Sequence, residues 1–431
     1  MNRHLLLAMV LSASLSTQAI TLKESLQMTH DNYPAIRQYQ LIEQTRDFTL
    51  ENASKGWLPQ VSASAGAYAF TDPIKSNEQI ARMGINFKNY MANASVTIRQ
   101  NLYDGGEIAA QKEVTSAQSE VQKHQLHVSM YGINERVQQI YFSILLLDEQ
   151  IVLNELHQKD LSTSEKNIRS LIKGGIANQS DLDAILVECL KLKQQKDAIV
   201  VSRQAYLQML GVFIGKELMV SEKLEKPSME SNVLRTPEGT TSDSSSSLFL
   251  AKNWGINRPE LQYYDSQNLL IDARRKQLDT RLRPTLSLFG MGMLHSKVSD
   301  MINYGMLAGG ISLSWNIGAL YTRKNDIRKL EVQRQMNDIQ REVFLFNNRL
   351  QNEQEYGIIA SLRKQIAQDT EIISLRESIR SKSDRKVQLG TESVNELVRD
   401  INAVNLAKTQ KAMHEIQLLQ EIYKLKYINN D

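Results

Sequence analysis

Apolar and polar residues alternate in one segment of the second half of the chain. Between residues 307 and 317 every second residue is apolar or glycine, and the residues between them are small or polar. The apolar set is Leu307, Gly309, Ile311, Leu313, Trp315 and Ile317. A period of two residues predicts a β-strand with one apolar and one polar face. The segments 61–70, 92–102 and 285–294 can be read in the same way, so the sequence predicts four strands.

A helical period follows the second and the fourth predicted strands. Residues 107–173 lack proline, and apolar residues recur there in steps of four and three, as in the seam of a coiled coil. Residues 321–387 form a second such stretch. The predicted seams are Ile133, Val137, Ile140, Ile144, Leu147 and Ile151 in the first stretch and Ile339, Val343, Phe346 and Leu350 in the second. Helices of this length reach about 100 Å, which indicates coiled coils rather than a compact globule.

Each long helix is expected to turn back into a shorter one, because glycines break the pattern and a helical period then resumes over about 180–213 and 394–427. A helix hairpin needs a residue that tolerates a positive φ at its turn, which favours Gly174, Gly175 and Gly390. Two further helices are predicted before the first and third strands, over about 22–56 and from 257–261 to 281–284.

Landmark residues of the first half recur in the second half at nearly constant offsets. The pairs are Asn32 with Asn257, Pro34 with Pro259, Pro59 with Pro284, Asn101 with Asn316, Gly175 with Gly390, and Asp181 with Glu396. The chain therefore reads as a tandem duplication of helix, strand, strand, long helix, turn and helix. We expect a signal peptide at 1–19, a first repeat at 20–235, a serine-rich linker at 236–250 and a second repeat at 251–431.

The N-terminal sequence and the composition indicate an exported chain. Arg3, an apolar stretch from Leu5 to about Leu15 and small residues before Ala19 are typical of a secretory signal peptide. No later segment is apolar for long enough to be a transmembrane helix. The single cysteine, Cys189, excludes a disulfide framework, and 51 basic against 48 acidic residues with no basic block argue against a nucleic-acid partner.

An apolar sheet face in an exported chain must be covered by helices or must meet lipid. The apolar stripes of the predicted helices are narrow seams, which suits packing between helices better than covering a sheet. In a membrane, strands without a helical anchor can span only as a closed β-barrel. Four strands cannot close a conducting barrel, so several chains would share one. A small soluble sheet remains the alternative at this point.

Several motifs resemble the TolC family of outer-membrane efflux and secretion channels. They are QNLYDGGE at 100–107, the NYP and NRP starts of the two halves, and the turn Gly-x-x-[Asn/Ser]-x-x-[Asp/Glu]-Leu that occurs in both halves. The resemblance covers essentially the whole mature chain. It implies a mainly α fold with long antiparallel coiled coils, in which a homotrimer builds a transmembrane β-barrel of twelve strands and a periplasmic α-barrel of twelve helices.

The resemblance also implies a function and partners. Such a protein is the exit duct of a tripartite efflux pump or a type I secretion system, located in the outer membrane and extending into the periplasm. Its partners are a periplasmic adaptor (a membrane fusion protein), an inner-membrane transporter and the lipid of the outer membrane. The channel is not an enzyme, and the sequence offers no catalytic, cofactor-binding or metal site. A periplasmic coiled-coil adaptor or scaffold without a pore is the alternative function.

Specific residues take roles from the resemblance. Acidic residues just after the helix-hairpin turn ring the periplasmic aperture and select cations, which points to Glu396 and, in the first repeat, Asp181. The alternative is that each carboxylate only complements the dipole of its helix. Two positions depart from the family pattern. Arg399, with Asp400 beside it, stands where the family often has an acidic residue, and Val387 stands where some members have a tyrosine. The sequence therefore does not predict how the tip is locked.

The remaining expected sites lie at the turns and on the strands. Gly174, Gly175 and Gly390 are expected at the tip turns where an adaptor docks. Asp104, Gly105 and Gly106 are expected to form the turn from strand to helix. Ile311, Leu313 and Trp315 are expected to face lipid, with Trp315 near the interface, while Ser312, Ser314 and Asn316 face water.

Overall fold

A computed structural model describes residues 19–69, 82, 90–228, 256–299 and 302–430. Residues 1–18 of the predicted signal peptide and the whole predicted linker at 236–250 lie outside these ranges.

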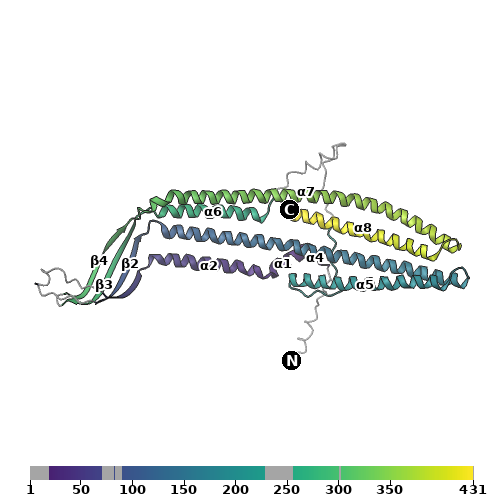
Figure 1. Cartoon of the computed structure of the whole chain (residues 1–431), viewed down its shortest axis with the longest axis horizontal. Helices are drawn as coiled ribbons and strands as arrows, with labels where there is room; N and C mark the ends of the chain where they lie inside the picture. The colour runs from purple at the N-terminus through teal and green to yellow at the C-terminus, as the bar shows by residue number, and fades with distance from the viewer. Residues whose placement is uncertain (1–18, 70–81, 83–89, 229–255, 300–301, 431) are drawn as a thin grey trace, which may run out of the picture. The chain divides into compact units, whose positions relative to one another are not determined.

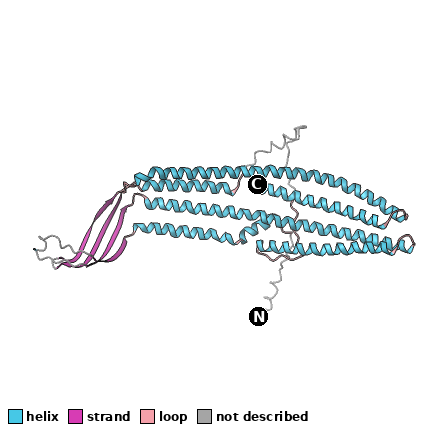
Figure 2. Ribbon diagram, viewed as in Figure 1, coloured by secondary structure: helices cyan, strands magenta, loops and turns pink. Residues whose placement is uncertain are grey.

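The predicted order of elements is confirmed and occurs twice along the chain (Figures 1 and 2). The first half contains α1 (Leu22–Asn32), α2 (Arg37–Ser54), β1 (Gln60–Ala69), β2 (Tyr90–Tyr103), α4 (Glu107–Lys173) and α5 (Gln179–Ile214). The second half contains α6 (Pro259–Thr280), β3 (Thr285–Ser299), β4 (Ile302–Ser314), α7 (Ala319–Gln388) and α8 (Val394–Asn429). At 67 and 70 residues, α4 and α7 have the length that the proline-free stretches predicted.

The helix expected over 22–56 is interrupted. Tyr33 adopts an extended conformation with φ −63° and ψ 127° and ends α1, and a short 3-10 helix, Pro34–Ile36, precedes α2. The cause is local, because a residue before proline is pushed out of the α region by the proline ring. A second 3-10 turn, Lys55–Trp57, follows α2.

The chain divides into two compact units, and each draws on both predicted repeats. The hairpin unit comprises 1–36, 128–258 and 344–431, and the sheet unit comprises 37–127 and 259–343. The two repeats therefore supply matching pieces to each unit instead of folding separately.

The strands form one antiparallel sheet in the order β1-β2-β3-β4. The pairing of β2 with β3, from Asn93 opposite His295 to Asn101 opposite Ser287, joins the two halves of the chain. The register shifts between Asn101 and Tyr103, at the end of β2 where the chain leaves the sheet. Among the described strands, β1 and β4 are the two edges.

The core of the hairpin unit is built on the predicted seam of α4. Ile133, Val137, Ile140 and Ile144 are at most 9% exposed and pack against residues of α5 and α8 such as Leu207. Leu147 and Ile151, further along the same seam, are only partly buried. A second apolar cluster lies next to the helix-hairpin turns and joins α4 and α5 to α7 and α8 through Leu161, Ile185, Leu397 and Ile401 among others.

The predicted seam of α7 is exposed in the described part of the chain. Ile339, Val343, Phe346 and Leu350 are between 52% and 63% exposed, and Met336 and Val332 continue the stripe at 57% and 53%. In the sheet unit α7 instead uses polar groups to hold α6: Asn337 donates to the carbonyl of Tyr264 and to the side chain of Asn268, each at 2.9 Å. The two predicted seams therefore differ, because that of α4 is buried and that of α7 is exposed.

Candidate functional site

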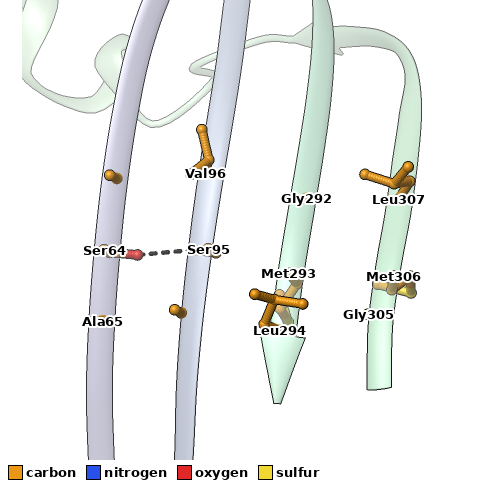
Figure 3. A pocket seen from close by; sticks show the side chains of 12 residues that line it. Ser64, Ala65, Ser95, Val96, Gly292, Met293, Leu294, Gly305, Met306 and Leu307 are labelled. Atoms are coloured by element: carbon orange, nitrogen blue, oxygen red, sulfur yellow. Dashed lines mark hydrogen bonds between the residues drawn. The ribbon is translucent and has the colours of Figure 1, made fainter. Parts of the chain in front are cut away.

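One face of the sheet is apolar over most of its described part, and Gln100 of β2, opposite Leu288, is a polar residue on it close to α4. The strand register places the following residues on this apolar face: Val61, Ala63, Ala65 and Ala67 of β1, Ala92, Ala94, Val96 and Ile98 of β2, Leu286, Leu288, Gly290, Gly292 and Leu294 of β3, and Gly305, Leu307, Gly309, Ile311 and Leu313 of β4. The larger side chains are exposed, with Ile311 at 68% and Leu307 at 91%. Figure 3 shows Val96, Leu294 and Leu307 beside a shallow groove over the small residues Ala65, Gly292 and Gly305.

The opposite face carries most of the polar residues of the strands. Ser62, Ser64, Asn93, Ser95, Thr97, Arg99, Ser287, Ser312 and Ser314 lie on it, together with Phe289, Met291 and Met293. Ser64 and Ser95, on neighbouring strands, share a hydrogen bond of 2.8 Å (Figure 3). In the middle of β2 and β4 the polar face is less exposed than the apolar one, as expected if the sheet curves with its polar face inside.

Of the three residues expected to face lipid, two lie within β4 and one lies just beyond its end. Ile311 and Leu313 lie on the apolar face, where they pair with Leu288 and Leu286. Trp315 lies one residue beyond the end of β4, so the strand ends earlier than the pattern predicted. Its indole N–H donates to the carbonyl of Leu282 at 2.8 Å while the side chain stays 59% exposed. This hydrogen bond fixes the ring at the end of the sheet where the helices begin.

Asp104, Gly105 and Gly106 form the turn between β2 and α4, as predicted. The buried carboxylate of Asp104 accepts hydrogen bonds from the backbone N–H groups of Gly106 and Ile108, at 2.9 and 2.8 Å. These donors have no partner within the helix, so the carboxylate caps it. Both glycines have positive φ, 70° and 88°, and a side chain on Gly105 would approach Arg283.

The two helix-hairpin turns have the same geometry. Gly175 and Gly390 have φ of 73° and 71°, and each follows a helix end closed by a pair of backbone hydrogen bonds in a Schellman motif. Gly174 does not share the positive φ, and Leu389 takes the matching place in the second turn. The turn conformation therefore requires glycine at Gly175 and Gly390 but not at Gly174.

Asp181 and Glu396 cap the helices that follow these turns. The side chain of Asn178 accepts from the N–H of Asp181 at 3.0 Å, and the carboxylate of Asp181 accepts from the N–H of Asn178 at 2.9 Å. Ser393 and Glu396 make the same reciprocal pair at 3.3 and 3.5 Å. Both acids are the third helical residue of a capping box, and both are partly exposed. The geometry thus gives each carboxylate a local structural role.

The structure also shows the surroundings of the residues that depart from the family pattern. Val387 is 4% exposed and belongs to the apolar cluster beside the turns. A polar side chain at this position would need a hydrogen-bond partner, which the apolar valine does not. Arg399 is exposed and Asp400 partly exposed on α8, one turn beyond Glu396.

Polar contacts between the two helix hairpins were not predicted from the sequence. Arg380 of α7 donates to Asp160 of α4 at 2.9 Å. His157 of α4 contacts Asn402 of α8 at 3.1 Å, and Asn402 donates to Glu188 of α5 at 3.3 Å. Burial lowers the pKa of His157, against the effect of the hydrogen bond that its ring donates to Oδ1 of Asn402. These residues follow no regular spacing in the sequence, so only the three-dimensional structure shows that they contact one another.

The described residues contain neither a candidate membrane-spanning helix nor a candidate metal site. No helix in the described ranges combines the length and the apolar composition needed to cross a membrane. In the same ranges, no three histidine, cysteine or acidic side chains gather in a way that could hold a metal ion.

Comparison with known proteins identifies the fold. No family model and no curated protein matches the sequence. The structure is similar to that of the outer-membrane channel OprN, with a TM-score of 0.64, 13% identity, and coverage of 94% of this chain and 89% of that one. For CusC, described for its transmembrane channel formation, the TM-score is 0.66 with 13% identity, covering 98% of this chain and 95% of that one. For the Campylobacter jejuni outer-membrane channel CmeC, the TM-score is 0.62 with 10% identity, covering 94% and 85%. The predicted fold class is confirmed: the chain has the mainly α fold, with a four-stranded β contribution, of the TolC-family outer-membrane channels.

Proposed function

We propose that this chain is one protomer of an outer-membrane channel that serves as an exit duct and does no chemistry itself. The observation that carries the proposal is the exposed apolar face of the sheet. The eighteen residues named above on that face are all apolar or glycine, with Gln100 only at the end of the face next to α4, and in water such a patch would be costly. Lipid is a solvent in which the same face is stable, and the 10 to 15 residues of each strand suit a tilted membrane-spanning strand.

The proposed oligomer is a homotrimer. Within the described sheet β1 and β4 are edges, and unpaired edges in a membrane must be satisfied by closing a barrel. Three copies of four strands give a twelve-stranded barrel. The exposed α7 seam supports this reading, because a stripe of apolar residues with coiled-coil spacing is suited to pack on a helix of a second copy.

The remaining parts of the proposal follow from the fold. The helices would continue the duct into the periplasm, where the tip would meet a periplasmic adaptor of an inner-membrane transporter, as in tripartite efflux or type I secretion. The alternative, a coiled-coil scaffold without a pore, leaves the apolar sheet face and the strand edges without a role. The outer membrane is therefore the proposed location.

Conductance of the purified protein in planar lipid bilayers tests the channel. Trimeric protein extracted with detergent should insert and give discrete conductance steps that favour cations. A protein that stays soluble without detergent and produces no conductance would exclude the channel and favour the scaffold.

We further propose that Glu396 and, to a lesser degree, Asp181 line the periplasmic aperture. Three copies of a carboxylate brought together by threefold symmetry would attract cations. The capping boxes support a fixed position for these side chains, since each carboxylate is held by a backbone N–H beside a turn of defined geometry. Arg399 and Asp400, one turn further along α8, would modify the field at the same level.

Replacing Glu396 with glutamine is expected to reduce the preference of the channel for cations. Glutamine at this position can still complete the capping box, so the turn should keep its structure while three charges are removed. Reversal potentials in a salt gradient measure the change. Asp181→Asn makes the matched change in the first turn and should have a smaller effect, whereas Glu371→Gln, at an exposed site on α7, should have none. Unchanged reversal potentials in Glu396→Gln would reject the aperture assignment.

The tip turns are the proposed docking site of the adaptor. Next to Gly174, Gly175 and Gly390, the turns expose two aliphatic side chains, Ile176 at 53% and Leu389 at 78%. Apolar side chains on tight turns are suited to contact the end of a partner coiled coil.

A photo-crosslinking residue placed at Leu389 is therefore expected to capture one discrete partner in intact cells. The control is Leu406 on α8, which is 70% exposed but lies three helical turns away from the hairpin turn. A discrete adduct with an adaptor at Leu389 and none at Leu406 is the expected result. Equal labelling at both positions would contradict docking at the tip.

A further inference from the structure

Two glutamates and a lysine meet between α7 and α8 in the hairpin unit. Glu355 on α7 is only 2% exposed. The ammonium group of Lys424 on α8 lies 2.6 Å from Oε1 of Glu355 and 3.6 Å from Oε2 of Glu421. One lysine thus faces two carboxyl groups at a largely buried place, where an uncompensated charge is costly.

The second carboxyl oxygen of each glutamate indicates how the excess negative charge of the two glutamates is compensated. Oε2 of Glu355 and Oε2 of Glu421 are both buried, and neither receives a hydrogen bond from a nitrogen or a hydroxyl group. Two buried acceptor oxygens without a donor, beside a single ammonium group, carry one negative charge more than that group balances. A proton on one carboxyl group would remove the excess charge and supply the missing donor, since a protonated carboxyl group donates and a carboxylate only accepts.

The surroundings of Glu355 and Glu421 consist of an apolar cluster and a small polar cavity. Ile359, Leu362, Leu418, Ile422 and Leu425 pack between the same two helices. On its other side Glu355 lines a cavity of about 340 Å³ with Glu135 of α4, Gln351 and Gln354 of α7, Arg258, and Lys424, Tyr427 and Ile428 of α8. The charged groups that line this cavity with Glu355 are Lys424, Arg258 and Glu135. The guanidinium of Arg258 is engaged with the rings of Tyr131, Phe344 and Tyr427, and donates to the carbonyl of Tyr427.

We propose that Glu355 and Glu421 together bind a single proton, with Lys424 balancing the one remaining negative charge, and that this proton holds α7 against α8. The site is a proton-binding site built into the hairpin that ends at Gly390. It does not depend on the proposed channel function, because every group in it belongs to one chain.

The direction of the pH dependence follows from the pKa of Glu421. Burial, and after it the hydrogen bond to Glu355, raise this pKa to about 7, against the effect of Lys424. An unfolded glutamate has a pKa of about 4.3. The folded pair therefore binds its proton more tightly than the unfolded chain does. The stabilisation is complete below the unfolded pKa and is lost as the pH rises through about 7.

Isotope-edited infrared spectroscopy of the whole protein tests the proposal. With glutamate labelled by carbon-13, the C=O stretch of a protonated carboxyl group should persist at pH 6 and disappear in a titration centred near pH 7. Glu421→Gln and Glu355→Gln should each abolish this band at pH 6, because the amide donates to the remaining carboxylate and makes the proton unnecessary. Glu353→Gln, an exposed glutamate of α7, is the matched control and should leave it unchanged.

Hydrogen exchange supplies a second, independent readout. Peptides covering 350–360 and 416–428 should exchange faster at pH 8.5 than at pH 6, after correction for intrinsic rates, in the wild type and in Glu353→Gln. In Glu421→Gln the difference should vanish. A wild-type protein whose glutamate C=O band disappears near the ordinary value of about 4.3 would overturn the shared proton. Exchange with the same pH dependence in Glu421→Gln as in the wild type would overturn its role in holding α7 to α8.

Discussion

Replacing Ile311 with arginine is expected to prevent stable insertion of the protein into lipid bilayers. Ile311 lies near the middle of the apolar face, is 68% exposed and faces Leu288 on the neighbouring strand. An arginine on the lipid face of a β-barrel costs about 2–4 kcal/mol near the midplane of the bilayer. This corresponds to roughly a 30- to 700-fold loss in the folding equilibrium for each copy. Three copies share one barrel in the proposed trimer, so the effect multiplies.

Ser312→Arg is the matched control, because Ser312 is the next residue along β4 and lies on the polar face opposite Ser287. It should fold and insert like the wild type, and its new charge should change ion selectivity instead. Refolding into lipid vesicles, followed by urea titration of the inserted fraction, measures both variants. Equal insertion of Ile311→Arg and Ser312→Arg would show that the apolar face does not meet lipid.

Replacing Phe346 with aspartate is expected to dissociate the proposed trimer. Phe346 is the most exposed of the four predicted seam residues of α7, at 63%. Burying a phenylalanine contributes about 1.5–3 kcal/mol, and this contribution would be lost at each of three equivalent contacts. An aspartate at the same place would also bring an unpaired charge into an apolar seam, which adds to the loss.

Asn347→Asp adds the same charge to the neighbouring exposed position, outside the seam, and should leave the trimer intact. Sedimentation or native mass spectrometry in detergent distinguishes the two species. If Phe346→Asp remained trimeric at protein concentrations where the wild type is trimeric, the α7 seam would not be a contact between copies.

The alternation of apolar and polar residues was enough to predict the sheet. A strand has a period of two, so sequence assigns each residue to a face once the strand is recognised. Glycines with positive φ and the capping motifs are equally local, and Gly175, Gly390 and Asp104 could be placed at their turns for that reason. The repeated order of elements supplied the rest of the architecture, which the fold comparison then confirmed.

Errors arose where a neighbour in the chain or in space changed the local preference. Pro34 interrupts the helix that the sequence predicted over 22–56. Trp315 continues the alternation but lies beyond β4, because the register with β3 ends at Ser314 opposite Thr285. Gly174 looks like a turn glycine, yet the positive φ falls on the next residue.

The sequence by itself determined which residues share a face and where each helix turns, since both follow from the local backbone period and from the few residues that permit a positive φ. Only the tertiary structure decided which faces are covered. It buried the seam of α4 and left that of α7 exposed, although both have the same spacing. It also brought Glu355 and Glu421, which lie on two different helices, to the same lysine. Burial and the meeting of charges depend on packing partners, and no period along a single chain contains that information.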